Sequence, residues 1–461
     1  MKRSFGLLVC GCWILGSVAA GSEVPGQQEE HRQKLVRQID SILQVPVDSG
    51  AVAGISAGVV YKGDTLLLKA YGFADLEHNV PTPSDAVYEI GSVTKQFTAT
   101  AILQLVDQER IDLDADLTAY LPEYPTGGRA IPIRRLMDHT SGIKGYTEMQ
   151  EFATIATRSL PRDSLVAMFS AAPFDFEPFY NNSAYFLLGL MIEEASGKPY
   201  EEFIDEHLFT PAGMEDSRYC SQTEIVTGRA HGYAGRPEGL VRGGYIDHTW
   251  PYAAGSLCST VRDLLRWNAA LHGDSSGGHL LSAESYLELI TPGHLNDGTP
   301  VRYAMGLGIA DFGGRRMIAH GGGIPGFLSD MRYFPNEDLT IVVLINTTGR
   351  VSPAAMARTI AGFVLGEPDV PAAGIYPGNL DGLVGTYVGP GRGTPLTVTI
   401  DRHESTLTAS FGNGDASELH YIDGLRFGLG DTRFTFLRRG GTISILQVDQ
   451  VSGLYVLDRQ D

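Results

Sequence analysis

The sequence predicts an α+β protein with a mainly antiparallel sheet, a helical insertion and a second, small all-β domain. Three observations lead to this prediction. β-rich runs occur at 51–73 and return from about residue 303 to 346, whereas a helical period fills most of the region between them. After a Pro/Ala/Gly-rich segment, short alternating runs recur about every ten residues. A chain of 461 residues with 43% hydrophobic and 19% charged residues is typical of a globular protein with a full core.

The N-terminus has the pattern of a signal peptide. Two basic residues precede an apolar run at 5–15, and the small residues 18–20 form a cleavage site. We therefore predict a signal peptide at 1–20 and an exported protein, periplasmic or secreted. No second apolar stretch of spanning length follows, so we expect no membrane span after cleavage. A lipoprotein cysteine at Cys12 is the weaker alternative, because the apolar run before it is short.

The next part of the chain, 21–366, is expected to form the main domain. Its predicted elements, in order, are an amphipathic helix within 21–50, strands at 51–61 and 65–73 joined by a tight turn, a helix from Ser92, mostly helical structure over 110–270, strands at 305–309, 316–320, 328–334 and 339–346, and a helix at 353–365. Because strands open and close this region, one sheet built from both ends is expected.

The C-terminal part is separated by a predicted linker at 367–376. The domain at 377–461 carries alternating runs at 396–400, 406–410, 419–422, 433–437, 443–448 and 454–457. This spacing is typical of a small antiparallel barrel or sandwich. No catalytic set of residues is visible in it. An oligomer formed through this domain is an open alternative to a role at the catalytic site.

Charge and residue usage exclude several classes of protein. The formal net charge is -19 and the pI is near 5.0, which disfavours binding to nucleic acid, whose phosphates demand a basic face. None of the 12 histidines stands in a metal-hydrolase spacing, so we expect no metal and no cofactor. After signal cleavage only Cys220 and Cys258 remain, and either a disulfide or two free buried thiols fits the sequence.

Three segments are candidates for a nucleophilic serine. Ser56 lies in a G-x-S-x-G pentapeptide, but more strand follows it where a nucleophile elbow needs a helix, so a strand serine is favoured. Ser-x-x-Lys occurs twice, as Ser92 to Lys95 and as Ser141 to Lys144. Ser92 opens a helix, which places the lysine on its face and adds the positive end of the helix dipole. The alternative for Ser92 is a plain N-cap, and Ser141 has the context of a turn.

Two further segments could complete a serine hydrolase site. Tyr180-Asn181-Asn182 precedes a helical run; a Tyr near a lysine can act as a base, and an Asn amide can hold a substrate carbonyl or the lysine. Packing and N-capping are the alternatives for these residues. His320-Gly321-Gly322-Gly323 follows a strand-like run, and its glycines allow backbone N–H groups to approach a ligand. The alternative is a glycine-rich turn with an incidental histidine.

The order Ser-x-x-Lys, Tyr-x-Asn, His-x-Gly resembles that of the serine β-lactamase and penicillin-binding-protein superfamily. The similarity is greatest to its class C β-lactamase, D-aminopeptidase, DD-peptidase and esterase branch, and it covers roughly 35–365. The segments 136–143, 208–214 and 254–264 also look like that branch. The resemblance implies a β-lactamase/transpeptidase-like fold for the main domain and a lipocalin-like barrel for the C-terminal one.

The resemblance also implies roles for single residues. Ser92 would be the acylated nucleophile, Lys95 would share protons with it, and Tyr180 would be the base. Asn182 would bind a substrate amide. The backbone N–H groups of Ser92 and Gly323 would form the oxyanion hole.

Two positions depart from the pattern of the family. Asn181 stands where Ser or Ala is more common and is expected to point away from the site. His320-Gly321-Gly322 replaces the Lys-Thr-Gly of β-lactamases, and the chain has no lysine after Lys198 that could stand in. That lysine ordinarily pairs with the substrate carboxylate, and a neutral or partly charged imidazole is a weaker partner. Antibiotic hydrolysis is therefore disfavoured as the main activity.

We therefore predict a serine hydrolase that forms an acyl-enzyme with a small molecule or short peptide. Its substrate would be a D-amino-acid peptide, a peptidoglycan-like amide or a small ester. The alternatives are a true β-lactamase and a slow-turnover penicillin-binding or sensor protein.

Overall fold

The computed structural model describes residues 25–174, 180–221, 223–273, 280–367, 375–391, 394–412, 414–451 and 453–460. The predicted signal peptide lies outside these ranges. Within them, no helix combines the length and the apolar character needed to cross a bilayer.

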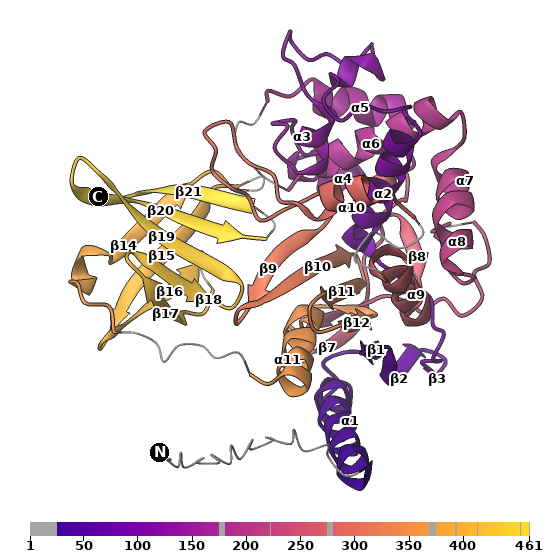
Figure 1. Ribbon diagram of the computed structural model, residues 1–461, viewed down its shortest axis with the longest axis horizontal. Helices are drawn as coiled ribbons and strands as arrows, with labels where there is room; N and C mark the ends of the chain where they lie inside the picture. Colours follow the sequence, from indigo (N-terminus) through magenta and orange to yellow (C-terminus); the bar gives the residue numbers. More distant parts are fainter. Residues whose placement is uncertain are drawn as a thin grey trace, which may run out of the picture.

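A seven-stranded antiparallel sheet forms the centre of the larger part of the molecule (Figure 1). Its strand order is β3-β2-β1-β12-β11-β10-β9. The bounds are β1 Gly54–Tyr61, β2 Asp64–Asp75, β3 Val80–Pro81, β9 Gly308–Phe312, β10 Arg315–Ile324, β11 Phe327–Phe334 and β12 Leu339–Ile345. β1 pairs with β12, with Ile55 opposite Ile345. The prediction of one sheet built from both ends of the region is therefore confirmed.

Several strand boundaries differ from the sequence prediction, and the differences in β9 and β10 bear on the site. β9 begins at Gly308, three residues later than expected. β10 continues through the glycine run as far as Ile324, so His320 and the three glycines lie in a strand and not in a turn. A glycine run lowers the strand signal in a sequence, but pairing with β11 holds it extended here, with Gly323 opposite Leu328.

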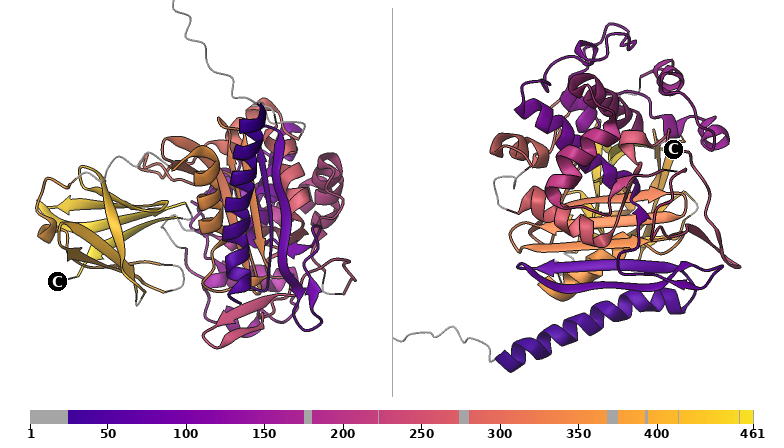
Figure 2. Two further views of the ribbon diagram at one scale, coloured as in Figure 1. Left: turned by 90° about the horizontal axis from the view of Figure 1, so that it is seen from below. Right: turned by 90° about the vertical axis from the view of Figure 1, so that its right-hand side faces the viewer.

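Helices cover both faces of the sheet, as Figure 2 shows. α1 (Pro25–Asp48) and α11 (Pro353–Leu365) pack on one face, around Ile39, Ile341 and Ile360. The other face packs against the helical insertion. The insertion contains α2 Thr94–Asp107, α3 Ile133–Met137, α4 Phe152–Ile155, α5 Arg162–Ser170, α6 Asn182–Ser196, α7 Tyr200–Ile204, α8 Thr210–Ala212, α9 Val261–His272 and α10 Ala283–Ile290. A π-helical turn (η4 Asp205–Phe209) joins α7 to α8.

Two small sheets also form. β4 (Tyr88–Glu89), β8 (Leu257–Ser259) and β5 (Arg218–Tyr219) form one small sheet, and β13 (Thr347–Thr348), β6 (Tyr233–Arg236) and β7 (Gly239–Arg242) form another. Four of these six short strands (β5, β6, β7 and β8) lie in the region that the sequence predicted as mostly helical. Cys220 and Cys258 form a disulfide across the first of these sheets, with Cα atoms 5.2 Å apart. Of the two alternatives that the sequence left open, the structure therefore selects the disulfide.

The C-terminal part is a closed antiparallel barrel in which β14 pairs with β21. Its strands are β14 Gly385–Gly389, β15 Leu396–His403, β16 Thr406–Phe411, β17 Ser417–Asp423, β18 Arg426–Leu429, β19 Thr432–Arg439, β20 Thr442–Gln450 and β21 Gly453–Arg459. The barrel projects to one side of the sheet and helices (Figures 1 and 2). Six of these strands match the predicted runs, whereas β14 and β18 contain glycines that weaken the strand signal.

Two arginines of the larger part of the molecule bind Asp431 of the barrel. Arg302 donates to the backbone oxygen of Asp431 over 2.5 Å, and Arg358 pairs with the Asp431 carboxylate over 2.8 Å. A side chain on Gly308 would overlap Val451, because its Cβ would lie 1.9 Å from the valine Cγ1. Val451, just after β20, is therefore packed closely against the start of β9.

Candidate active site

Ser92 lies in a 3-10 turn, Gly91–Val93, that leads directly into α2. The turn requires glycine at position 91, where φ is +51° and a Cβ would lie 2.9 Å from the backbone nitrogen of Gly323. The Ser92 turn and β10 are thus in close backbone contact, and the half-buried serine is placed at their junction.

Lys95 lies one turn further along, and its side chain is completely buried. Its Nζ donates to Asn182 Oδ1 over 2.7 Å and to the Ala254 backbone oxygen over 2.7 Å, and it lies 3.3 Å from Ser92 Oγ. An ammonium group has three N–H donors, and a buried charge is tolerated only where such acceptors surround it. The structure therefore aims one N–H of Lys95 at the serine oxygen and fixes the others on α6 and on the 252–254 turn.

Asn181 and Asn182 have different tasks at the start of α6. The side chain of Asn181 caps the helix by accepting from Ala184 N over 3.1 Å, and its amide donates to Ile143 O. It therefore points away from Lys95, as expected, but it is buried and holds the loop before Tyr146 in place. Asn182 binds Lys95 through its oxygen and Thr147 Oγ1 through its nitrogen, over 3.3 Å.

Tyr180 lies in a cluster of aromatic rings beside the lysine. Lys95 Nζ lies 4.5 Å from the centroid of the Tyr180 ring. The ring of His139 lies 4.4 Å away, that of His320 5.9 Å and that of Tyr303 6.0 Å, the last in an edge-to-face arrangement. The Ser-x-x-Lys, Tyr-x-Asn and His-x-Gly motifs thus meet at one buried site, together with Tyr303.

His320 uses both ring nitrogens within the protein. Nδ1 lies 2.6 Å from Gly321 O, which can only accept, so Nδ1 carries the proton. Nε2 lies 2.8 Å from the Tyr303 hydroxyl and accepts from it. Burial, with the nearby Lys95 charge, lowers the pKa of His320 from 6.5 to about 3. The imidazole is therefore neutral at physiological pH. Of the two states considered from the sequence, neutral and partly charged, the neutral one is the weaker partner for a substrate carboxylate.

The glycines after His320 allow β10 to approach the Ser92 turn. A Cβ on Gly322 would lie 2.0 Å from Ile90 O and 2.3 Å from Ser329 Oγ. Ser329 in turn donates to Ile90 O over 2.8 Å. This contact can form only with glycine at 322, which explains the glycine run more fully than a turn would.

Three residues of the site were not assigned from the sequence. His139 accepts a hydrogen bond from Asn181 N over 3.1 Å and stacks against Tyr180. Ala254 supplies the backbone acceptor for Lys95, and Tyr303 fixes His320. The first two lie in segments that look like the family, 136–143 and 254–264, and this was the available signal. Tyr303 gave no signal, because it is one of 20 tyrosines.

The two other serine candidates lie in different surroundings. Ser56 is buried in β1 and bonded to the Tyr88 hydroxyl over 2.9 Å, in the middle of the sheet. Ser141 lies in a loop, and Lys144 pairs with Glu148 over 3.6 Å. Both arrangements agree with the structural interpretations that the sequence favoured for them.

Barrel residues at the end of β20 and the start of β21 border the aromatic cluster. A small cleft is lined by His139, Tyr180 and Tyr303 on one side, and by barrel residues including Gln450 and Val451 on the other. The space left between them is about 10 Å³, which is room for roughly one water molecule. In this conformation the barrel closes that side of Tyr180.

Comparison with known proteins shows which family has this arrangement. A family model described as beta-lactamase matches residues 39–365. A D-aminopeptidase of Brucella canis is 27% identical over 369 residues, which cover 78% of this chain and 68% of the relative. A penicillin-binding protein of Bacillus subtilis (strain 168) is 27% identical over 330 residues, covering 67% and 72% of the two chains.

Solved structures agree on the fold. The octameric penicillin-binding protein homologue from Pyrococcus abyssi has a TM-score of 0.63 and 23% identity, and covers 92% of this chain and 99% of its own. The D-amino acid amidase from Ochrobactrum anthropi SV3, solved with D-phenylalanine, has a TM-score of 0.63 and 24% identity, and covers 72% and 99% of the two chains. The predicted fold, family and serine hydrolase class are confirmed: this chain belongs to the beta-lactamase family.

Proposed function

We propose that the protein hydrolyses amides of D-amino acids, as free amides or short peptides, through an acyl-enzyme on Ser92. The observation that carries this proposal is the environment of Lys95. A lysine side chain is buried completely only where its charge has a use or a set of partners, and one of its N–H groups points to Ser92 Oγ. Such an ammonium stabilises negative charge that develops on the serine oxygen.

The reaction would proceed in two steps. In the first, Ser92 Oγ attacks the amide carbon and its proton passes to the Tyr180 oxygen, which in the Lys95–Tyr180 pair would be a phenolate beside the lysine ammonium; Tyr180 then gives this proton to the departing amine and the C–N bond breaks. In the second, water is activated by that pair, attacks the ester carbon and releases the acid. The backbone N–H groups of Ser92 and Gly323 would stabilise the oxyanion of both steps. Asn182 would hold Lys95 and orient the substrate amide.

The proposed substrate class rests on two observations. The relatives include a D-aminopeptidase and a D-amino acid amidase. In addition, a neutral His320 with both nitrogens engaged offers no cation to a substrate carboxylate. Substrates whose carboxylate is already an amide therefore fit better than β-lactam antibiotics, which carry a free carboxylate. The barrel residues packed closely beside Tyr180, among them Gln450 and Val451, favour small substrates.

A penicillin-binding protein with slow turnover is the second candidate. It is supported by the Bacillus subtilis relative of that name and by the same serine and lysine, which would also open a β-lactam ring. The two candidates differ in the fate of the acyl-enzyme. A hydrolase releases product repeatedly, whereas a penicillin-binding protein stays labelled.

The deciding experiment compares matched substrates on the purified protein. The panel contains D- and L-amino acid amides and anilides, short p-nitrophenyl esters, a chromogenic cephalosporin and a fluorescent penicillin, with Ser92→Ala as background. We expect repeated turnover of the D-amides and a preference over their L-enantiomers. Stable labelling by the fluorescent penicillin without turnover of any substrate would support the second candidate. Fast cephalosporin hydrolysis would contradict both.

Two sequence predictions extend this proposal. Export by the segment 1–20 is checked by N-terminal sequencing of the mature protein from the cell envelope or medium. Assembly through the barrel is checked by light scattering on a size-exclusion column, where a monomer mass would contradict it.

A further inference from the structure

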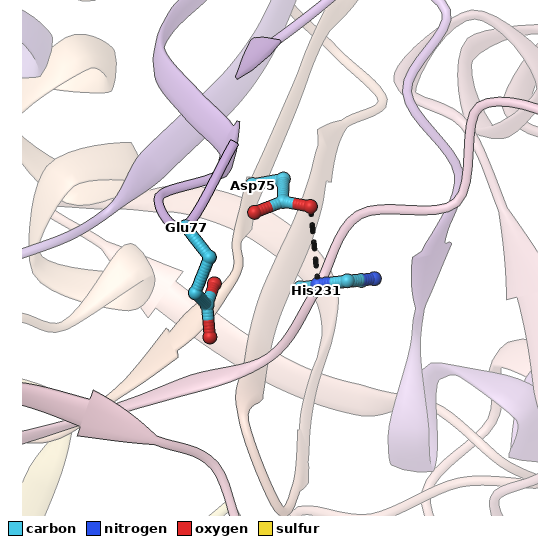
Figure 3. Close-up of side chains that lie close together, drawn as sticks. All are labelled: Asp75, Glu77 and His231. Carbon is cyan, nitrogen blue, oxygen red and sulfur yellow. Dashed lines mark ion pairs between the residues drawn. The ribbon is translucent and has the colours of Figure 1, made fainter. Parts of the chain in front are cut away.

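A group of metal-ligating side chains lies away from Ser92, where the turn after β2 meets the segment before β6. Asp75 Oδ2 lies 2.8 Å from His78 Nδ1 and 3.5 Å from His231 Nδ1. The Glu77 carboxylate is close, since one ligand atom each from Asp75, Glu77 and His231 lie within 4.8 Å of one another. Figure 3 shows Asp75 and Glu77 on one stretch of chain and the His231 ring facing them.

The two segments are held in register by buried hydrogen bonds. His231 N donates to Ala74 O over 2.8 Å. The amide of Asn346, which is completely buried, donates to Phe73 O and to His231 O, both over 3.0 Å. The backbones that carry Asp75 and His231 are thus tied to each other and to the end of β12. The backbone that would carry such a site is therefore already held in place.

Tyr233 fixes the turn itself. Its hydroxyl donates to Glu77 Oε2 over 2.5 Å and accepts from Leu76 N over 2.8 Å. The other Glu77 oxygen accepts from Arg242, whose side chain is 71% exposed and can leave without uncovering a core. One Glu77 oxygen is therefore held by Tyr233, whereas the other is held by a solvated arginine that a stronger partner can replace.

The spacing of the donor atoms suits a small tetrahedral cation. Zinc bonds of about 2.0–2.1 Å place neighbouring tetrahedral ligands about 3.3 Å apart. Asp75 Oδ2 lies 2.8 and 3.5 Å from the two imidazole nitrogens, on either side of that value, and the ligand atoms of Asp75, Glu77 and His231 lie within 4.8 Å of one another, so side-chain rotation has to close the remaining gap. Imidazole nitrogens with carboxylate oxygens suit zinc and similar first-row ions, whereas calcium and magnesium prefer oxygen ligands throughout.

We propose that Asp75, Glu77 and His231, with His78 beside Asp75 as a fourth ligand, bind one divalent transition-metal ion such as zinc. These residues are not among the groups around Lys95, so the ion would tie two surface segments together and leave the reaction to Ser92. No ligand motif indicates the site in the sequence, since His231 stands more than 150 residues after the others. The competing interpretation is a carboxylate that only accepts hydrogen bonds from two imidazoles.

The experiment is a zinc titration of the untagged, chelator-stripped full chain by calorimetry near neutral pH. We expect one zinc per chain for the wild type. His78→Ala removes a ligand whose side chain is 76% exposed, so the fold should be kept, and the dissociation constant should rise at least about tenfold. His231→Ala should do the same. His403→Ala, an exposed histidine in β15, is the matched control and should bind as the wild type does.

Thermal unfolding gives a second readout that is independent of activity. A bound ion stabilises the folded state, so zinc should raise the melting temperature of the wild type and of His403→Ala, and less that of His78→Ala. Absence of binding at millimolar zinc would overturn the proposal. So would an unchanged dissociation constant in both His78→Ala and His231→Ala. Either result leaves the proposed amidase activity untouched, because that depends on Ser92.

Discussion

The chain contains the pattern Ser-x-x-Lys twice, and the two copies differ in local structure, in burial and in the partners of the lysine. Ser92 and Lys95 lie at the start of a buried helix, and the lysine is completely covered by protein. Ser141 and Lys144 lie in a loop, where the lysine pairs with Glu148 and keeps 24% of its side chain exposed. The first lysine has its hydrogen-bond partners on three separate segments, whereas the second pairs with an acid only four residues away.

The difference shows that the Ser-x-x-Lys pattern provides a hydroxyl and an amine but does not by itself make a reactive site. A lysine near water is a solvated charge that can pair with a neighbouring acid. A buried lysine must have its donors satisfied, and the acceptors that satisfy it also fix its direction. Only the first copy therefore presents an ammonium group to a serine in a defined geometry.

The largest contrast is expected between the two serines. Ser92→Ala should lower kcat/KM for the preferred D-amide at least about 10⁴-fold, because the acyl-enzyme cannot form. Ser141→Ala should leave kcat/KM unchanged. Steady-state kinetics and mass spectrometry of the acylated protein measure both. Retention of full activity by Ser92→Ala would remove the basis of the comparison.

The two lysines should differ nearly as much. Lys95→Met removes the ammonium that stabilises negative charge on the serine oxygen and on Tyr180, and a loss of about 10³-fold in kcat/KM is expected. It also leaves Asn182 Oδ1 and Ala254 O without their donor, so the melting temperature should fall. Lys144→Met should change neither quantity appreciably. Circular dichroism at the assay temperature separates loss of chemistry from unfolding, and equal losses in both variants would contradict the assignment.

Tyr303→Phe is a smaller change in the surroundings of Ser92 and Lys95. The substitution removes the hydroxyl that donates to His320 Nε2, while the ring stays in the aromatic cluster. Since that hydrogen bond favours the neutral imidazole, its loss should raise the pKa of His320, and kcat should fall by about tenfold or less. The pKa is followed by NMR of the imidazole carbons, with His320→Asn to assign the signal. An unchanged titration would show that Tyr303 does not position His320.

The smallest expected effect is a dependence of stability on pH. The folded pKa of His320 is about 3, below its ordinary 6.5, so the unfolded chain binds more protons between these values. The stabilisation is complete above pH 6.5 and is lost as the pH falls toward 3. Its slope is at most about 1.4 kcal/mol per pH unit.

Urea unfolding at several pH values within that range measures this slope. His320→Asn should show a shallower fall in the free energy of unfolding than the wild type. His272, a second buried histidine with a pKa lowered to about 3, is the matched control outside the site. Substitution of either one should reduce the slope by a similar amount. A slope unaffected by both substitutions would contradict the burial of neutral imidazoles.

Much of the fold was predictable because it is written in local patterns. The tight turn between β1 and β2 follows from Lys62-Gly63, which the structure shows at φ of 52° and 78°. The long strands β11 and β12 follow from their apolar runs. The strand character of residues 321–323 did not follow, because glycine has little strand preference and only pairing with β11 imposes it.

The sequence by itself determined the family, the order of the motifs and which Ser-x-x-Lys opens a helix, because these depend on residues a few positions apart. The tertiary structure alone decided what Lys95 touches, since Asn182 and Ala254 are 87 and 159 residues away along the chain. It also decided the Cys220–Cys258 disulfide and the neutral state of His320, which Tyr303 and burial impose. Local patterns set which groups a segment carries, whereas the charge state and direction of a buried group depend on its neighbours in space.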